Sequence, residues 1–240
     1  MERNTGRCKM EDGRCKMEEV RDKVKEIKQS FRLMMDGAVA QSMRDKGLNY
    51  HLNWGATLPR LKAKAEELKA NSQKPKAIRN ATLCSAENSQ YDLAIALWKE
   101  NVRECKILAT MLMPAEEMLP EVCDIWMEQI PSQEIAEQAA FNLWQHLPYA
   151  PEKAYQWIAS DQEYYQLCGF HVLSRLFMNG QEPNERGINE FIDQALSALQ
   201  GPYMSVRKAA MQSMVHFAEL GLVYERMAKS AMKSINLEFF

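Results

Sequence analysis

Segments with an apolar face that contains small residues return along this chain at helical spacing. The clearest covers residues 97–109, and similar segments begin at Ile135, Tyr165 and Val206. The last three begin 30 and 41 residues apart, and periods of roughly 30 to 45 residues are typical of stacked helix pairs. The pattern therefore predicts a helical repeat protein.

The rest of the chain also has helical periodicity and almost no strand signals. Apolar residues between Glu18 and Met43 recur close to helical spacing, which predicts one long first helix, and residues 58–68 predict a second amphipathic helix. We find no alternating Val, Ile and Thr run and no Asn-Gly or Asp-Gly hairpin turn. The sequence thus predicts an all-α fold, a superhelix of HEAT-like antiparallel helix pairs (an α-α solenoid).

Two of the apolar stripes are rich in alanine, which lets neighbouring helices approach closely. We expect both stripes to lie in the core. They consist of Ala136, Ala139, Ala140, Leu143 and Leu147, and of Val206, Ala209, Ala210, Met214 and Phe217.

The first residues differ from the rest of the chain. A tandem heptad, 6–12 followed by 13–19, has no apolar face to bury. We therefore expect residues 1–17 to be a disordered extension and residues 18–240 to form a single HEAT-like domain. The pattern leaves open whether translation begins at Met1, Met10 or Met17.

Charge is distributed unevenly behind a net value of only −2. Residues 1–80 hold 19 Lys and Arg against 11 Asp and Glu, whereas residues 81–200 hold 6 against 18. If nucleic acid is the partner, the phosphate contacts must come mainly from the first third and from the last helices. The acidic middle favours the alternative of a non-enzymatic scaffold that binds another protein.

Several functional classes have no support in the sequence. No apolar run approaches the roughly 18 to 20 residues that cross a bilayer, and the N-terminus is charged where a secretory signal carries its apolar core. Four histidines lack ligand spacing, and six cysteines form no CxxC pair, three of them lying in apolar stripes. We expect a cytoplasmic monomer with buried reduced cysteines, no metal and no cofactor.

Three motifs together resemble a known family. They are Leu97-Trp98 followed by Arg103-Glu104 and Ala109, the loop Tyr50-x-Leu52-Asn53-Trp54-Gly55 that leads into Leu58-Pro59-Arg60-Leu61, and Trp157-Ile158-Ala159-Ser160-Asp161. They are similar to the DNA alkylation repair family, the AlkD-like HEAT-repeat DNA glycosylases. The resemblance covers roughly residues 50 to 220.

The resemblance implies a curved superhelix whose concave face holds duplex DNA, plain or damaged. Enzymes of the family release N3- or N7-alkylated purines, whose positive charge already weakens the glycosidic bond. A carboxylate beside tryptophans then stabilises the positive charge that develops on sugar and base, and the tryptophan faces add cation–π attraction.

The chain departs from the family pattern at the residues that carry this chemistry. Glu134 stands where the tryptophan is expected and Gln138 where the acid is expected, while the second tryptophan falls at about Gln212 and a DNA-contacting arginine at about Leu167. Glu137 is the candidate for a displaced acid, although one residue rotates a helical side chain by about 100°. We therefore expect a DNA-binding member with weak, altered or absent base excision. An active glycosylase that uses Glu134 or Glu137 is the alternative.

Candidate DNA-binding side chains come from the basic first third, from the repeat core and from the last repeat. Trp54 is favoured because it lies in a loop beside Arg60. For Arg103 next to Glu104, an ion pair between helices competes with a DNA contact, and Trp98 and Trp157 are expected to pack between helices. The full set of candidates is Trp54, Arg60, Lys62, Arg103, Arg207 and Lys208, with Lys64, Lys69, Lys74, Lys76 and Arg79 as further cations that could instead form a solvated face.

Overall fold

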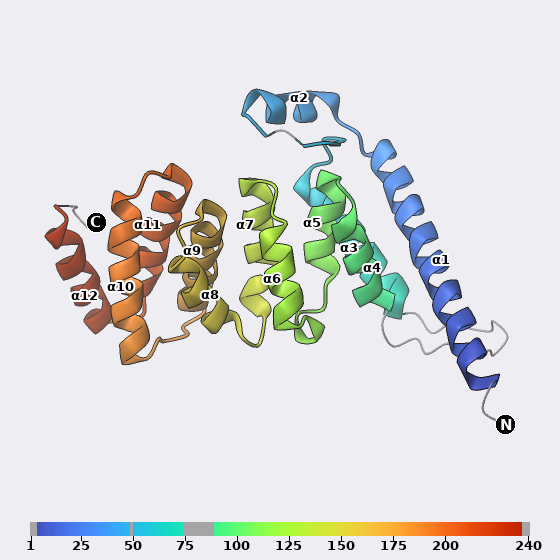
Figure 1. Ribbon diagram of the computed structural model, residues 1–240. Coiled ribbons are helices and arrows are strands. Elements are labelled where there is room, and N and C mark those ends of the chain that lie inside the picture. The colour runs from blue at the N-terminus through green and yellow to red at the C-terminus, as the bar shows by residue number, and fades with distance from the viewer. Residues whose placement is uncertain (1–3, 49, 74–88, 237–240) are drawn as a thin grey trace. The chain divides into compact units, whose positions relative to one another are not determined.

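The computed structural model describes residues 4–48, 50–73 and 89–236, and every regular element in these ranges is helical (Figure 1). The prediction of an all-α fold is therefore confirmed. Contacts along the chain divide it into two compact units, residues 1–117 and 118–240, and we describe each unit by itself. The organisation of residues 18–240 as one domain stays a prediction.

Unit 1 contains five α-helices and a short 3-10 helix in its described residues. Helix α1 begins inside the segment 1–17, for which composition predicts disorder, and the order of that segment in solution stays a prediction. The elements are α1 (Asn4–Leu33), α2 (Gly37–Asp45), α3 (Leu58–Gln73), α4 (Ser89–Lys99), α5 (Arg103–Leu112) and η2 (Ala115–Glu117).

The predicted long helix between Glu18 and Met43 is wrong, because the chain breaks between α1 and α2. The Asp36 carboxylate accepts hydrogen bonds from the backbone N–H groups of Ala38 and Val39, at 3.0 and 3.1 Å, and so caps the new helix. The Asp36 N–H donates to the Trp54 carbonyl at 2.9 Å. A contact distant in sequence thus fixes the end of the first helix.

The segment before α3 lies directly on the start of α2. Gly55 has φ +74°, and a Cβ atom there would come within 2.1 Å of the Asp36 carbonyl oxygen and 2.9 Å of the Ala40 nitrogen. Only glycine fits both the positive φ and the close backbone approach. This glycine therefore fixes the path of the loop that carries Trp54.

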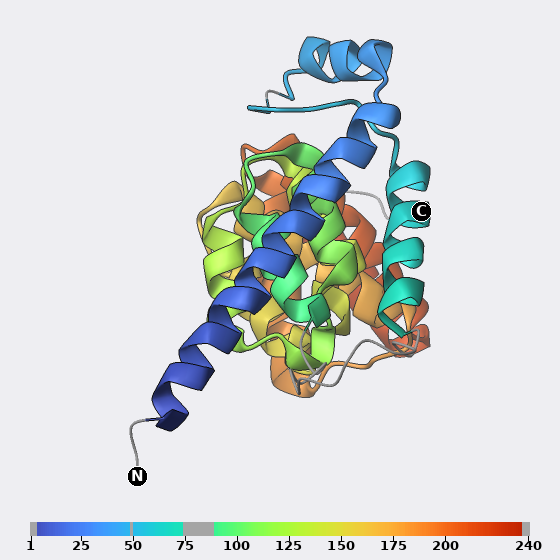
Figure 2. The ribbon, with the colours of Figure 1, turned by 90° about the vertical axis from the view of Figure 1, so that its right-hand side faces the viewer.

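Helices α1, α3, α4 and α5 build the core of unit 1. Helix α1 crosses α4 (Figure 2) and buries Val24, Ile27 and Phe31 on one face, each at most 5% exposed. Its Lys28 forms an ion pair of 2.8 Å with Glu100, just after α4. Helix α5 is buried along nearly its whole length, charged residues included, so its polar side chains must find partners inside the protein.

Unit 2 contains seven α-helices and one short 3-10 helix between residues 118 and 236. Helices α7, α9 and α11 contact one another in that order and form one layer, while α8 packs on α9, and α10 on α11. The elements are α6 (Pro120–Glu128), α7 (Gln133–Asn142), η3 (Trp144–His146), α8 (Ala150–Ile158), α9 (Glu163–Met178), α10 (Glu185–Gln200), α11 (Met204–Glu219) and α12 (Leu222–Ser234).

Small residues allow the close packing of unit 2. All ten members of the two predicted alanine-rich stripes are buried, which confirms their place in the core. At Gly169 a Cβ atom would lie 2.7 Å from Ile158 Cγ2 and 2.8 Å from the Ala154 carbonyl oxygen, so α8 and α9 touch through a residue with no side chain. Prolines at the starts of α6 and α8 and the Asn184 cap of α10 set the helix starts.

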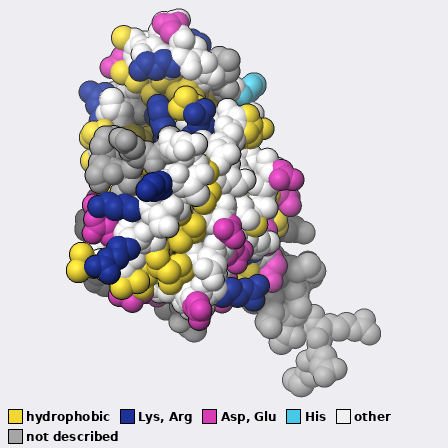
Figure 3. Space-filling view, turned by 90° about the vertical axis from the view of Figure 1, so that its left-hand side faces the viewer, with side chains coloured by type: hydrophobic (Ala, Val, Ile, Leu, Met, Phe, Trp, Pro, Cys, Tyr) yellow, Lys and Arg dark blue, Asp and Glu magenta, His cyan; other side chains and the backbone are white. Residues whose placement is uncertain are grey.

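Helix α12 covers the end of unit 2. Its inner side is buried through Ala228 and Met232, whereas Leu222 and Val223 are 72% and 65% exposed. Figure 3 views the molecule from the side that carries α12, where hydrophobic side chains lie open between basic and acidic ones.

Candidate nucleic-acid interface

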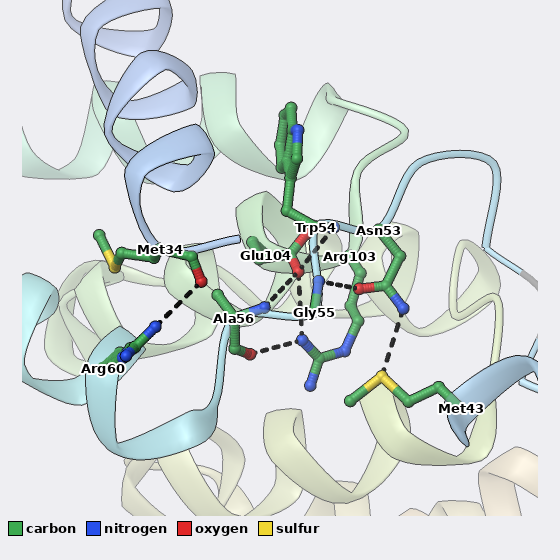
Figure 4. A network of polar contacts seen from close by, with 9 residues as sticks. All are labelled: Met34, Met43, Asn53, Trp54, Gly55, Ala56, Arg60, Arg103 and Glu104. Carbon is green, nitrogen blue, oxygen red and sulfur yellow. Dashed lines mark hydrogen bonds and ion pairs between the residues drawn. The ribbon is translucent and has the colours of Figure 1, made fainter. Parts of the chain in front are cut away.

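A buried ion pair in unit 1 organises the loop that carries Trp54 (Figure 4). Arg103 and Glu104 are 1% and 0% exposed, and Arg103 Nη1 lies 3.3 Å from Glu104 Oε1. The same carboxylate oxygen accepts from the N–H groups of Trp54 at 3.1 Å and Ala56 at 3.2 Å. Arg103 Nη1 also donates to the Ala56 carbonyl at 2.9 Å. The ion pair therefore binds N–H groups and a carbonyl group of the loop backbone at Trp54 and Ala56.

Arg103 consequently cannot serve as the DNA contact that the sequence suggested. Its guanidinium is enclosed by the loop and by Glu104, so a phosphate cannot reach it while the loop is in place. Of the two interpretations of Arg103, the internal ion pair is the one that the structure supports. This pair joins α5 to the loop rather than two helices.

The other candidates of unit 1 lie at its surface. Trp54 is partly exposed, its ring centroid lies 5.7 Å from that of Phe31, and Figure 4 shows the indole pointing away from the polar network. Arg60 is exposed and donates to the Met34 carbonyl at 3.2 Å. Lys62 is exposed on α3. Of the further cations, Lys64 and Lys69 pair with Glu67 and Glu66, and Lys74, Lys76 and Arg79 lie outside the described residues.

In unit 2, the exposed face of α11 carries the candidates from the last repeat. Arg207 and Lys208 are both exposed, and neither forms an ion pair within the described part of the chain. Gln212 is exposed one turn after Lys208, so the two share a face. The approximate position at which the resemblance predicts a second tryptophan is thus open to solvent.

A cluster on α7 and α9 was missed by the sequence analysis. The Arg175 guanidinium lies over the ring of Phe141, 4.7 Å from its centroid, and the ring of His171 meets Phe141 edge-on at 4.8 Å. Arg175 is partly exposed and has no acidic partner among the residues described. The spacing of four between His171 and Arg175 places them on one helix face, which is the only sequence signal for the cluster.

The positions at which the resemblance predicts a tryptophan and an acid lie on α7, the helix that carries Phe141. Glu134, Gln138 and Phe141 follow one another at helical spacing and share a face of α7. The Gln138 Oε1 atom accepts from Asn142 Nδ2 at 3.3 Å, and Glu137 Oε1 accepts from Gln133 Nε2 at 2.8 Å. Gln138, at the position where the resemblance predicts the acid, therefore presents an amide one turn before Phe141 on the same face of α7.

Two hydrogen bonds show how α9 and α11 are aligned. Ser205 Oγ, at the start of α11, donates to Glu163 Oε1 at the start of α9, at 2.5 Å. His216 Nδ1 and Ser174 Oγ, near the other ends, lie 2.8 Å apart. The two helices therefore run parallel, and the exposed cations at the start of α11 are separated from Arg175 by roughly 15 Å along the helix axes.

The environment of His171 keeps its imidazole neutral. Burial lowers its pKa from 6.5 to about 4, and the positive charge of Arg175 acts in the same direction. At neutral pH the permanent charge of this cluster is therefore that of the guanidinium alone. His171 offers a ring face and one N–H donor.

The tryptophans of the repeat are core residues. Trp98 and Trp157 are each 1% exposed, which confirms that they pack between helices. Trp126 and Trp144 are equally buried, and the rings of Trp144 and Trp157 lie 4.8 Å apart. All five tryptophans lie in the described ranges, and Trp54 is the one whose ring reaches the surface. Leu167, near the position at which the resemblance predicts a DNA-contacting arginine, is 1% exposed.

Three cysteines in the described ranges are buried, and the residues of these ranges form no group that could bind a metal ion. Cys105, Cys123 and Cys168 are free and buried, and burial raises the pKa of all three thiols, to about 12 for the first two. Within these ranges we find no group of three His, Cys, Asp or Glu side chains that could hold a metal ion. No described helix is both long and apolar enough to cross a membrane.

Comparison with known proteins decides the family. A family model for DNA alkylation repair enzymes matches residues 27–209. The chain belongs to the DNA alkylation repair enzyme family. The match includes the Trp54 loop, the Arg103–Glu104 pair and the α7–α9 cluster, and it ends in α11 just after Lys208.

A solved structure shares the fold of this DNA alkylation repair family member. It comes from a family of proteins described as related to the HEAT-like repeat DNA glycosylases with affinity for branched DNA structures. The two chains superpose with a TM-score of 0.70 at 14% identity, over 88% of this chain and 82% of the other. The HEAT-like fold is thereby confirmed. No curated protein sequence matches the chain.

Proposed function

We propose that this chain binds duplex DNA, plain or damaged, as a cytoplasmic monomer. The binding surface in unit 2 is the α7–α9–α11 face, which we define by Gln138, Phe141, His171, Arg175, Lys208 and Gln212. Trp54, Arg60 and Lys62 supply contacts from unit 1. Family membership supports the choice of ligand.

The observation that carries this proposal is the set of unpaired cations on the α7–α9–α11 face. Several cations elsewhere in the described chain are tied to carboxylates, as in the pairs of Lys28 with Glu100 and Lys153 with Asp124. Arg175 and Lys208 have no such partner in the described ranges and are at least partly open to solvent. Unpaired Arg and Lys side chains are the groups that replace counterions on phosphates. The ring of Phe141 beneath Arg175 holds that side chain in place.

Fluorescence anisotropy with four labelled DNAs tests the proposal. The probes are a linear duplex, the same duplex with an abasic analogue, a single strand and a four-way junction, each at low and moderate salt. The junction is included because the structural relative is described as having affinity for branched DNA. We expect salt-sensitive binding to at least one double-stranded probe. Absence of binding to all of them at low salt would overturn the proposal.

Two variants locate the surface. Replacing Arg175 and Lys208 by Gln removes two cations that face phosphates, so the slope of log affinity against log salt should become less steep by about one for each cation removed. The matched control is the double variant Lys23→Gln/Lys25→Gln, which removes two cations of α1 that form ion pairs with Glu19 and Asp22. Equal losses in the variant and in the control would show that net charge, and not this face, governs binding.

We propose binding without standard base excision, because the resemblance predicts the catalytic acid at the position of Gln138, which is an amide. Gln138 carries no charge that could stabilise an oxocarbenium ion, and its Oε1 atom is engaged by Asn142. The test is release of N3- or N7-methylated purine from methylated duplex, with none expected above the rate of the DNA alone. Release that is lost in Glu137→Gln or Glu134→Gln would instead favour the displaced acid of an active glycosylase.

A further inference from the structure

A pocket of about 430 Å³ opens in unit 2, away from the residues assigned to DNA. Its walls come from the first two turns of α8, the second half of α9, the loop that follows it and the first turns of α10. This volume lies within the range of roughly 300 to 1,000 Å³ that is usual for ligand pockets. It is large enough for one or two long side chains.

The floor of the pocket is apolar. Leu173, Leu176 and Phe177 of α9 form it, and they are at most 7% exposed. Phe177 is held by Phe191 and Phe217, at ring distances of 5.0 and 5.5 Å. The floor is therefore rigid and offers a surface for methylene groups or a ring.

The rim of the pocket carries excess negative charge. It contains three carboxylates, Glu152, Glu182 and Glu190, against one guanidinium, that of Arg186. Glu182 accepts a hydrogen bond from the Tyr224 hydroxyl at 3.0 Å. Glu152 and Glu190 have no basic partner in the part of the chain that the structure describes. Two carboxylates thus remain uncompensated above an apolar floor.

The wall that comes from α8 adds a polar group, the hydroxyl of Tyr155. The hydroxyl of Tyr155 is buried and has no hydrogen-bond partner among the described atoms. It lies so close to Gly187 that a Cβ atom there would be 2.8 Å from it. Burial, with a contribution from Glu190, raises the pKa of Tyr155 to about 12, so the phenol stays neutral and adds no further negative charge.

An apolar floor below an anionic rim matches a long basic side chain. Lys and Arg have an apolar stem and a charged head, and they bury the stem while the head remains near the surface. A simple metal cation would gain nothing from the floor, and a purely apolar ligand would leave the carboxylates unpaired. The rim residues Glu152, Glu182 and Arg186 are exposed, so a chain that crosses the surface can reach the opening.

We propose that this pocket binds a protein partner through an Arg or Lys side chain with an apolar residue next to it in sequence. The site lies outside the DNA-binding face and goes beyond the DNA-binding function. Residues 81–200 hold 18 Asp and Glu against 6 Lys and Arg. The pocket is the place in this acidic part of the chain where we expect a basic partner to bind.

Selection from a random peptide library displayed on phage tests the proposal with the full chain as bait. The matched baits are the pocket variant Glu152→Gln/Glu190→Gln and the control variant Glu121→Gln/Glu128→Gln, which removes two exposed carboxylates of α6 outside the pocket. We expect the wild type and the control to enrich the same peptides, each with Arg or Lys beside an apolar residue. The pocket variant should not enrich them.

Fluorescence anisotropy of the most enriched peptide completes the test. Exchange of its basic residue for citrulline or norleucine, and the pocket variant itself, should each weaken binding by about tenfold or more, with no change for the control variant. Circular dichroism verifies that all variants are folded. No enrichment, enriched peptides without a basic residue, or equal affinity for the wild type and the pocket variant would each overturn the proposal. DNA affinity is measured on the same variants and is expected to be unchanged. Failure of the pocket proposal can therefore be distinguished from failure of the DNA-binding proposal.

Discussion

Replacing Glu104 by alanine should be among the most damaging single substitutions in unit 1. The change removes the carboxylate from a guanidinium that is 1% exposed. It also removes the acceptor for the Trp54 and Ala56 N–H groups, which now lie 3.1 and 3.2 Å from Glu104 Oε1. Breaking a buried ion pair from one side costs about 3–5 kcal/mol, and a buried N–H that loses its acceptor costs about 1–3 kcal/mol. These costs overlap in one network, so we expect a loss of about 3–5 kcal/mol in all.

Two further variants separate the causes of this loss. Glu104→Gln keeps an acceptor at the position of Oε1 but removes the charge, so it should retain the two loop hydrogen bonds and lose less stability than Glu104→Ala. Glu67→Ala breaks an exposed pair with Lys64, in which Glu67 is 57% exposed, and should cost less than about 1 kcal/mol. A buried network predicts that the loss of stability is largest for Glu104→Ala, intermediate for Glu104→Gln and smallest for Glu67→Ala.

The assay is urea unfolding of the full chain followed by circular dichroism, together with hydrogen exchange of the peptide that covers residues 52–57. Hydrogen exchange is needed because the chain has two compact units, which can unfold in separate urea transitions. Glu104→Ala should lower the protection of the Trp54 and Ala56 amides far more than that of amides in α9. A cost for Glu104→Ala no larger than for Glu67→Ala, or unchanged protection of the loop, would refute the proposed network.

The sequence predicts the helices and their buried faces well, because these depend on local periodicity. The stripe that begins at Val206 and the proline that starts α6, Pro120, are examples in which residues within a few turns determine the structure. The break after Leu33 is different. Apolar spacing continues through it, and Asp36 ends the helix only together with the Trp54 carbonyl, which comes from 18 residues further along.

The candidate site was less predictable for the same reason. Arg103 beside Glu104 is compatible with a DNA contact and with an ion pair, and only the burial of α5 under the loop decides between them. Arg175 was not identified because its partner Phe141 lies on a different helix, 34 positions earlier in the sequence. Cation–π contacts between helices leave no periodic trace in a single sequence.

Three smaller predictions concern pH, thiols and glycines. Because the pKa of His171 is lowered from 6.5 to about 4 in the folded state, only the unfolded chain takes up this proton between those values; stability should be complete above pH 6.5 and fall by up to about 3 kcal/mol towards pH 4. Urea unfolding at pH 7 and 4.5 should show a smaller loss in His171→Gln. In a variant with Ser at positions 8, 15 and 84, the remaining thiols should react with a disulfide reagent only on unfolding, and fast reaction in the folded state would contradict their burial. Gly55→Ala should cost more than about 2 kcal/mol, against about 1 kcal/mol for Gly47→Ala, because both have positive φ but only Gly55 faces backbone atoms within 4 Å; equal costs in urea unfolding would argue against the close approach.

The residues that most clearly link this chain to its family are those that hold the fold together. Trp98, Arg103, Glu104 and Trp157 are each at most 1% exposed, so they cannot touch a ligand in the folded state. The same loop motif contains Gly55, which is required by the approach of α2. A resemblance carried by such buried residues supports the architecture and says little about catalysis.

On the proposed α7–α9–α11 face, the resemblance predicts an acid at the position of Gln138 and a tryptophan at about Gln212. Gln138 is partly exposed and Gln212 is exposed. Arg175 and Lys208 on the same face keep positive charge without an acidic partner in the described ranges. Unpaired cations together with an amide at the expected acid position are the combination that the proposal of DNA binding without standard base excision expects. Measuring DNA affinity and base release on one preparation therefore tests separately whether the protein binds DNA and whether it excises bases.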